Sequence, residues 1–557
     1  MAAPEIRAPQ SRTGHALFAG TGRLTGAVMK REVSYSIIWI VCLVAMTLVG
    51  PWELLMLYGD TRALQNFVTI LKIPAMVAML GPVFAKISQA SYAVISTNEM
   101  LLISLVLVAI MNCFYVVRQT RKDEEQGNLE IVRSLPVGRL ANLASTLLGA
   151  VMINVVLGIC VTVSLVALHA ADASYTFAGA LSYGLAFVVC GLVFAGLAAL
   201  IAQLASTARG ANTISMCLLG AFYLMRAFGD IKGSWRALSY ISPLGLPLFV
   251  KPYLENTLWP LLVLLAVAIV LIAVAFVLAQ ARDLDAGLIP TRDGFEHAPA
   301  WLCGNFGLVW RQMRNQLIGW AIVMVLVGVS YGSFLGVIDN FLKSNKFFAR
   351  IMPPVAGFST AQVFLSLLMV VFALVACIPP LLLVLKLHSE EFHGHLEFEL
   401  TTPLRRARVF ADYLIYAFVT SLVMVLITAV ALWITNLAVM PSGEAMSFWS
   451  TLKLIGLYLP AIWAMIGFAA VLVGAAPTRT IGAWSYLAVG FYATYLGRVF
   501  LKNTSWSWVI KISPFGWIPE YPLDPIHIWP LVILTLIAVA LTAVGVYSFG
   551  QRDLEIG

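Results

Sequence analysis

Apolar runs long enough to cross a lipid bilayer recur along the whole chain and leave no stretch over for a soluble domain. A membrane-spanning helix needs about 20 predominantly apolar residues. Only 11% of the residues are charged, whereas soluble domains average about a quarter. The sequence therefore predicts an all-α polytopic membrane protein. The twelve expected spans cover residues 36–57, 97–117, 142–168, 177–204, 211–228, 257–280, 317–338, 363–386, 413–437, 452–474, 480–498 and 528–550.

Two weaker apolar stretches, residues 66–85 and 337–355, contain prolines and basic side chains. We interpret them as interfacial or re-entrant helices rather than spans. Basic residues concentrate in loops on the cytoplasmic side of a membrane, and their distribution here predicts that both termini are cytoplasmic. The net charge of +8 is explained by Arg and Lys side chains that face anionic lipid headgroups, so nucleic acid is not implied.

The chain contains an internal repeat. A shift of about 270 to 281 residues brings Gly26 and Trp39 onto Gly307 and Trp320, and the closing Arg282-Asp283 onto Arg552-Asp553. Each half has an even number of expected spans, so the two six-helix halves are parallel repeats. The expected domains are residues 1–282, a cytoplasmic linker 283–305, and residues 306–557.

Each half opens with an amphipathic segment, residues 17–33 and residues 306–315. Their apolar faces are expected to lie on the bilayer while long basic side chains reach the headgroups. A simple positive-inside anchor is the alternative interpretation. The basic residues concerned are Lys30, Arg31, Arg311 and Arg314.

A short motif recurs at identical spacing between the second and third expected spans of each half. In the first copy, acidic residues 123–125 lie where a helix would begin and Arg133 lies near where it would end, an arrangement that the helix dipole favours. Pro136 then ends that helix. Glycine in a helix interior costs about 1 kcal/mol, so its repetition suggests the close approach of a partner's backbone, with the nearby glutamate facing basic groups. A solvated loop helix is the alternative. The motif residues are Glu124, Glu125, Gly127, Glu130, Pro136 and Arg139, and then Glu391, Gly394, Glu397, Pro403 and Arg406.

This motif resembles the coupling helix of ABC-2 type exporter permeases. Two six-span units fused in one chain, each with an amphipathic start, resemble the tetronasin-resistance type of polyketide antibiotic exporter, with an ABC-2, type V exporter-like fold. The second copy departs from the usual pattern at Phe392-His393 and Thr401-Thr402.

The resemblance implies a permease subunit in a bacterial plasma membrane that exports amphipathic drug or polyketide compounds by alternating access. Each motif would dock on one of two copies of a separate ATPase, which would bind ATP and Mg²⁺. The chain itself has neither a phosphate-binding loop nor a nucleotide-sandwiching signature. No catalytic residue, metal site or cofactor is expected in this chain.

Two rival functions remain open. A proton-coupled antiporter with twelve spans would need ionisable groups inside the membrane, and Arg226 and Arg498 are expected only at span ends. An ABC transporter of lipid or lipid-linked cargo would use the same uncharged cavity, which is also expected to contact membrane lipid. The candidate cavity residues are Asn112, Phe114, Phe222, Tyr223, Phe372, Tyr486, Phe491 and Tyr492.

Overall fold

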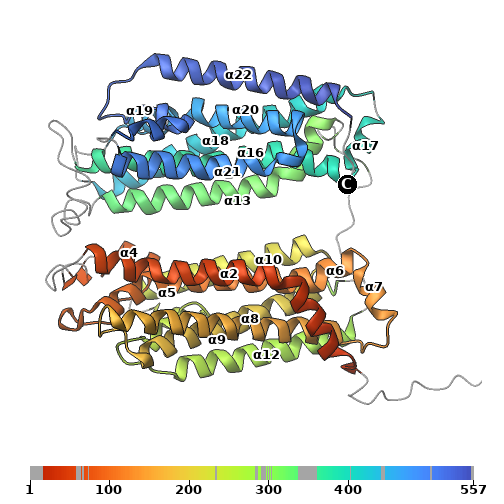
Figure 1. Cartoon of the computed structure of the whole chain (residues 1–557), viewed down its shortest axis with the longest axis vertical. Helices are drawn as coiled ribbons and strands as arrows, with labels where there is room; N and C mark the ends of the chain where they lie inside the picture. The colour runs from red at the N-terminus through yellow and green to blue at the C-terminus, as the bar shows by residue number, and fades with distance from the viewer. Residues whose placement is uncertain are drawn as a thin grey trace, which may run out of the picture. The chain divides into compact units, whose positions relative to one another are not determined.

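The computed structural model describes most of the chain as long helices bundled into two units (Figure 1). The units are residues 1–294 and residues 295–557. The predicted stretch 337–355 and most of the predicted linker lie outside the described residues. The structure describes residues 17–57, 74–231, 235–282, 304–335, 360–401, 403–440, 446–501 and 505–553, with short pieces between 64 and 72 and between 287 and 302.

The described part of the chain confirms an all-α polytopic membrane protein, since all its elements are helical. Eleven of its helices are long and apolar enough to span a membrane. In the first unit the long helices are α2 (Thr21–Leu57), α5 (Tyr92–Val117), α8 (Ala141–Ala167), α9 (Phe177–Leu204), α10 (Ala208–Ile231) and α12 (Trp259–Ala281). In the second they are α13 (Asn305–Phe334), α16 (Thr360–Phe392), α18 (Arg406–Val439), α19 (Phe448–Gly456) together with α20 (Leu459–Ala475) as one span, and α22 (Ile528–Gln551).

The expected span 480–498 is an irregular helix. It begins as α21 (Ile481–Phe491) and continues as the π-helical Tyr492–Leu501. The wider π turn changes the register by a residue or more, which fits the repeat itself. The shift is 270 residues from Gly220 to Gly490 before this segment and 271 from Ser242 to Ser513 after it.

Shorter elements connect the spans. At one end of the first unit these are α4 (Pro74–Leu80), η1 (Ile87–Gln89), η3 (Leu168–Ala170), α11 (Ala237–Ile241) and η5 (Leu246–Val250). In the second unit η10 (Ser507–Ile512) and η11 (Pro514–Trp517) lie at the equivalent end. At the opposite end, which we call the coupling end, lie the repeated motifs and η8 (Pro477–Arg479), close to Gly474, whose carbonyl oxygen accepts from Arg552 Nε.

Small residues bring the central helices of each unit into close contact. A Cβ on Gly184 of α9 would lie 2.6 Å from the carbonyl oxygen of Gly158 in α8. In the second unit a Cβ on Gly474 of α20 would lie 2.1 Å from the carbonyl oxygen of Gly545 in α22. Apolar side chains gain little by association within lipid, so such backbone contacts supply much of the packing between membrane helices.

Each predicted amphipathic opening is continuous with the span that follows it. The 37 residues of α2 are far more than the roughly 20 that cross the hydrocarbon core. Its first turns bend away from the rest of the helix at the coupling end (Figure 1). In the second unit α13 likewise runs unbroken for 30 residues.

Candidate functional site

The repeated motif is not one continuous helix, so that prediction is wrong. In the first unit α6 (Asp123–Glu125) ends before Gly127, and α7 (Asn128–Arg133) begins after it. Gly127 has φ +72° and Gly394 has φ +75°, and α17 (His395–Leu400) begins directly after Gly394. Glycine adopts this left-handed backbone without the steric cost that a Cβ brings.

The conformation of the backbone gives a sufficient reason for both glycines. Within the described part of the chain, a Cβ at Gly127 or Gly394 would have no atom within 4 Å. The expected reason, close approach of a partner's backbone, stays a prediction. Each glycine turns the chain, so that the short helix following it leaves the direction of the preceding span.

A buried cluster of charged residues fixes the first motif to the last span of its own unit. Glu124 is 5% exposed, and its Oε2 lies 2.7 Å from Arg282 Nη2 and 3.1 Å from Arg121 Nη1. Arg139, the last residue of the motif, donates from Nη2 to the Arg282 carbonyl oxygen at 2.8 Å. Arg282 is the C-cap of α12, so the beginning and the end of the motif meet at one helix terminus.

The second unit repeats this arrangement. Glu391, 1% exposed, accepts two hydrogen bonds of 2.5 Å from the Arg552 guanidinium. Arg406 donates from Nη1 to the Arg552 carbonyl oxygen at 2.8 Å, and Arg552 is the C-cap of α22. We call each set of three residues a Glu–Arg latch. The latches are Glu124, Arg139 and Arg282, and Glu391, Arg406 and Arg552.

Four of the residues predicted to couple to an ATPase thus bond within their own unit, the exposed Arg139 included: Glu124, Arg139, Glu391 and Arg406. Glu125 also bonds within its unit, where its Oε1 accepts from the backbone N–H of Ala208 at 2.7 Å. Ala208 is the first residue of α10, where a carboxylate interacts favourably with the helix dipole. The motif is therefore held by both the fifth and the sixth spans of its unit.

The remaining motif residues face outward in matching positions. Glu130 and Glu397 are exposed, as are Pro136 and Pro403 after the two short helices. The leucine before each glutamate is buried, at 7% exposure for Leu129 and 1% for Leu396.

Directly after each of these glutamates comes a large apolar residue that is also exposed. Ile131 is 69% exposed and Phe398 is 77% exposed. The sequence-based prediction did not include Ile131 and Phe398, although helical periodicity places them on the outer face. Residues two apart on a helix do not share a face, so the buried leucine leaves the second apolar residue outside.

Electrostatics distinguish the two acids of α17. Burial, together with the nearby charge of Glu390, raises the pKa of Glu399 above its ordinary value. Glu397, by contrast, is exposed. The outward-facing negative charge of α17 is therefore centred on Glu397, beside the exposed Phe398.

The predicted headgroup residues divide into two groups. Lys30, Arg311 and Arg314 are exposed. Arg31 instead binds Asp123 of the first motif at 2.6 Å, so it connects α2 to α6. The second unit has a different pairing, in which Glu390 binds His395 at 2.8 Å.

Within each unit, the predicted cavity residues differ in how deeply they are buried. Asn112 is 1% exposed and forms reciprocal amide hydrogen bonds of 3.0 and 2.7 Å with Asn154 of α8. Phe372 is 0% exposed, in the core of the second unit. Both therefore pack inside a unit.

The other six lie nearer the surface of their units. Phe114 and Tyr492 are exposed, whereas Phe222, Tyr223, Tyr486 and Phe491 are half-buried. Among these, Tyr486 donates its hydroxyl to the Ile512 carbonyl oxygen at 2.8 Å.

Buried ion pairs occur in both units near the span ends where the sequence places Arg226 and Arg498. Arg226 pairs with Asp230 at 3.0 Å and Arg498 with Glu520 at 3.3 Å. Both guanidiniums also donate to loop carbonyl oxygens, Arg226 to Val77 at 3.3 Å and Arg498 to Ile518 at 2.7 Å. These contacts assign the two arginines to holding the connecting segments in place, because each cation is already paired with an acid.

Comparison with known proteins bears on both units. A family model described as "Multidrug efflux system permease Rv1217c, C-terminal domain" matches residues 37–278 and 302–550. The multidrug efflux system permease protein Rv1217c of Mycobacterium tuberculosis (strain ATCC 25618 / H37Rv) is 32% identical over 553 residues, which cover 99% of this chain and 97% of that protein. Both exposed glutamates, Glu130 and Glu397, lie within the residues that the family model matches.

Proposed function

The chain belongs to the family of the multidrug efflux system permease Rv1217c, and from this premise we propose that it is the membrane subunit of an ABC-2 type exporter driven by a separate ATPase. The observation that carries the proposal is the duplicated motif. In both units it presents an exposed acid beside an exposed apolar side chain, while its two ends are fixed by a Glu–Arg latch.

Each exposed pair is the contact we propose for one ATPase subunit. An apolar side chain that inserts into a groove gives much of the affinity of an interface, and the adjacent carboxylate adds orientation through basic groups of the partner. The pairs are Glu130 with Ile131 and Glu397 with Phe398. Two such pairs match two copies of an ATPase, which would bind the ATP and Mg²⁺.

The latches provide the route by which motion of the ATPase would reach the membrane. Glu124 and Glu391 join each motif to the C-terminal end of α12 or α22, and Glu125 joins the first motif to α10. Displacement of α7 or α17 would therefore also displace the fifth or sixth span. Alternating access follows when closure of the ATPase pair favours one arrangement of the two units over the other.

The proposed cargo is an amphipathic or hydrophobic compound of the drug or polyketide antibiotic class. The name of the relative states multidrug efflux, and uncharged spans suit such cargo. The proposed setting is a bacterial plasma membrane with both termini in the cytoplasm, so that the motifs face the ATPase. The tetronasin-resistance type remains the finer assignment that we propose.

The test is ATP-dependent export by the chain purified with the ATPase that accompanies it, in proteoliposomes loaded with a fluorescent amphipathic drug. A double variant, Glu130→Lys with Glu397→Lys, is expected to abolish ATP-dependent export while membrane insertion stays normal. The matched control is Gln126→Lys, because Gln126 is exposed on the same motif and the change adds a cation without removing the acid. Wild-type rates in the double variant, or export driven by an ion gradient without ATP, would refute the proposal.

A further inference from the structure

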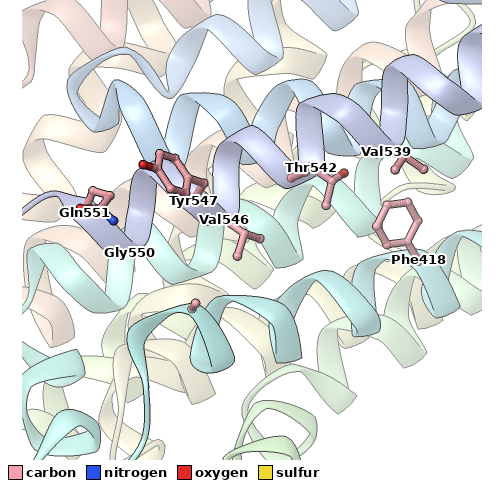
Figure 2. A pocket seen from close by; sticks show the side chains of 9 residues that line it. Phe418, Val539, Thr542, Val546, Tyr547, Gly550 and Gln551 are labelled. Carbon is pink, nitrogen blue, oxygen red and sulfur yellow. The ribbon is translucent and has the colours of Figure 1, made fainter.

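An apolar groove runs between α18 and α22 in the second unit (Figure 2). Its volume is about 700 Å³. Phe418 of α18 and Val546 of α22 point into the space between the two helices (Figure 2). The lining residues are Ala407, Phe418, Val539, Thr542, Ala543, Val546, Tyr547, Gly550 and Gln551.

The groove has the length of one leaflet. On α22 it extends from Val539 to Gln551, which at 1.5 Å per residue is about 18 Å. Half of a bilayer's hydrocarbon core is about 15 Å thick. A single extended acyl chain matches this shape, whereas a compact ring system would fill only part of it.

Polarity changes along the groove in the way that a phospholipid requires. The Thr542 hydroxyl is already bonded to the Ala538 carbonyl oxygen at 2.7 Å, so the deep part is effectively apolar. Toward the coupling end the lining includes the Tyr547 side chain and the amide of Gln551. Hydroxyl and amide groups there can bond to ester and glycerol oxygens.

Two exposed arginines flank the groove residue Ala407 in sequence. Ala407 lines the groove and lies between Arg405 and Arg408, both exposed. Arg408 is 71% exposed at its side chain, with Nε 3.4 Å from Asp412 Oδ1. Among the described residues that line the groove, none is acidic. Basic groups beside a groove between membrane helices favour an anionic headgroup.

The corresponding position in the first unit is covered by the chain itself. The shift of 270 residues that relates Arg282 to Arg552 places Phe276 of α12 at the position of Val546. The Phe18 ring lies 5.6 Å from the Phe276 ring, edge to face. Backbone hydrogen bonds hold the segment that carries Phe18 next to α8, where the N–H of Leu140 donates to the Leu17 carbonyl oxygen at 3.0 Å. Among the described residues, an apolar side chain thus occupies in the first unit the place that is an open groove in the second.

We propose that the groove between α18 and α22 binds one acyl chain of an anionic phospholipid from the leaflet at the coupling end, with Arg405 and Arg408 holding its phosphate. The lipid chain covers in the second unit the apolar surface that Phe18 covers in the first. This site requires no ATPase and no transport, so it stands apart from the proposed function.

The experiment uses the full chain in phosphatidylcholine nanodiscs that contain a small fraction of phosphatidylglycerol with a diazirine on its acyl chain. After illumination, cross-linked peptides are mapped by mass spectrometry. The proposal expects labelling concentrated on the groove-facing positions of α18 and α22, several-fold above other lipid-facing helices. A phosphatidylcholine probe of the same acyl chain is expected to label these positions several-fold less.

Two variants separate the parts of the site. Ala543→Trp fills the groove and is expected to remove the concentrated labelling. Its matched control is Ala273→Trp, which the 270-residue shift places at the same register of α12 and which is exposed there. Replacing Arg405 and Arg408 by Gln should equalise the two probes while chain labelling persists. Gel filtration checks that each variant remains folded.

Three outcomes would overturn the proposal. The first is wild-type labelling of the groove no stronger than that of the exposed face of α12. The second is labelling in a folded Ala543→Trp protein equal to that of the wild type. The third, equal labelling by both probes in the wild type, would overturn the anionic headgroup.

Discussion

Replacing Glu391 by Gln tests whether the latch holds α17 to the end of α22. The Glu391 side chain is 0% exposed and that of Arg552 is 17% exposed, so the pair is largely removed from water. Loss of one partner of a buried ion pair costs about 3 to 5 kcal/mol, because the other charge is left uncompensated. Arg552 keeps hydrogen bonds to the carbonyl oxygens of Gly474 and Val473, so we expect the lower value of about 3 kcal/mol.

If opening of α17 requires the latch to break, its amide hydrogens should exchange faster in Glu391→Gln. A change of about 3 kcal/mol corresponds to roughly a hundredfold. Hydrogen exchange of the purified chain in nanodiscs, followed by mass spectrometry of peptides covering His395–Leu400, gives the measurement. The control is Glu397→Gln on the same helix, which is exposed and should leave exchange unchanged. Unchanged exchange at α17 in a folded Glu391→Gln protein would refute the role of the latch.

Two further predictions concern the backbone and the core. Gly127→Ala should destabilise the first motif by about 1 kcal/mol, because the left-handed backbone is unfavourable for a residue with a Cβ. Gly127→Asn should cost less. Equal rates of proteolysis at this motif in the two variants would contradict the conformational argument. Asn154→Leu should lower thermal stability by about 1 to 2 kcal/mol, because the buried Asn112 amide loses its partner. The double variant Asn112→Leu with Asn154→Leu should cost less than the sum of the two single variants. Additive losses in thermal unfolding would show that the two amides act independently.

Hydropathy and spacing predicted eleven of the twelve expected spans as the described helices have them, because a bilayer requires a nearly uncharged run of fixed length for each crossing. The duplication was equally readable, since identical spacing of Glu124, Gly127 and Glu130 in two diverged surroundings is visible without coordinates. The exposed Ile131 and Phe398 were also within reach of helical periodicity. The sequence did not predict that the amphipathic starts are continuous with α2 and α13, because charge alone does not mark where a helix leaves the membrane.

The sequence by itself determined the class of the protein, its two-fold repeat and the location of the outward-facing motif. Only the tertiary structure decided which motif residues face outward and which bind within their own unit. Glu124 and Arg282 are separated by 158 positions, and Glu391 and Arg552 by 161, so no local pattern reveals that they meet. A long-range ion pair depends on how the spans pack against one another, and that packing depends on shape and small-residue contacts that periodicity does not encode.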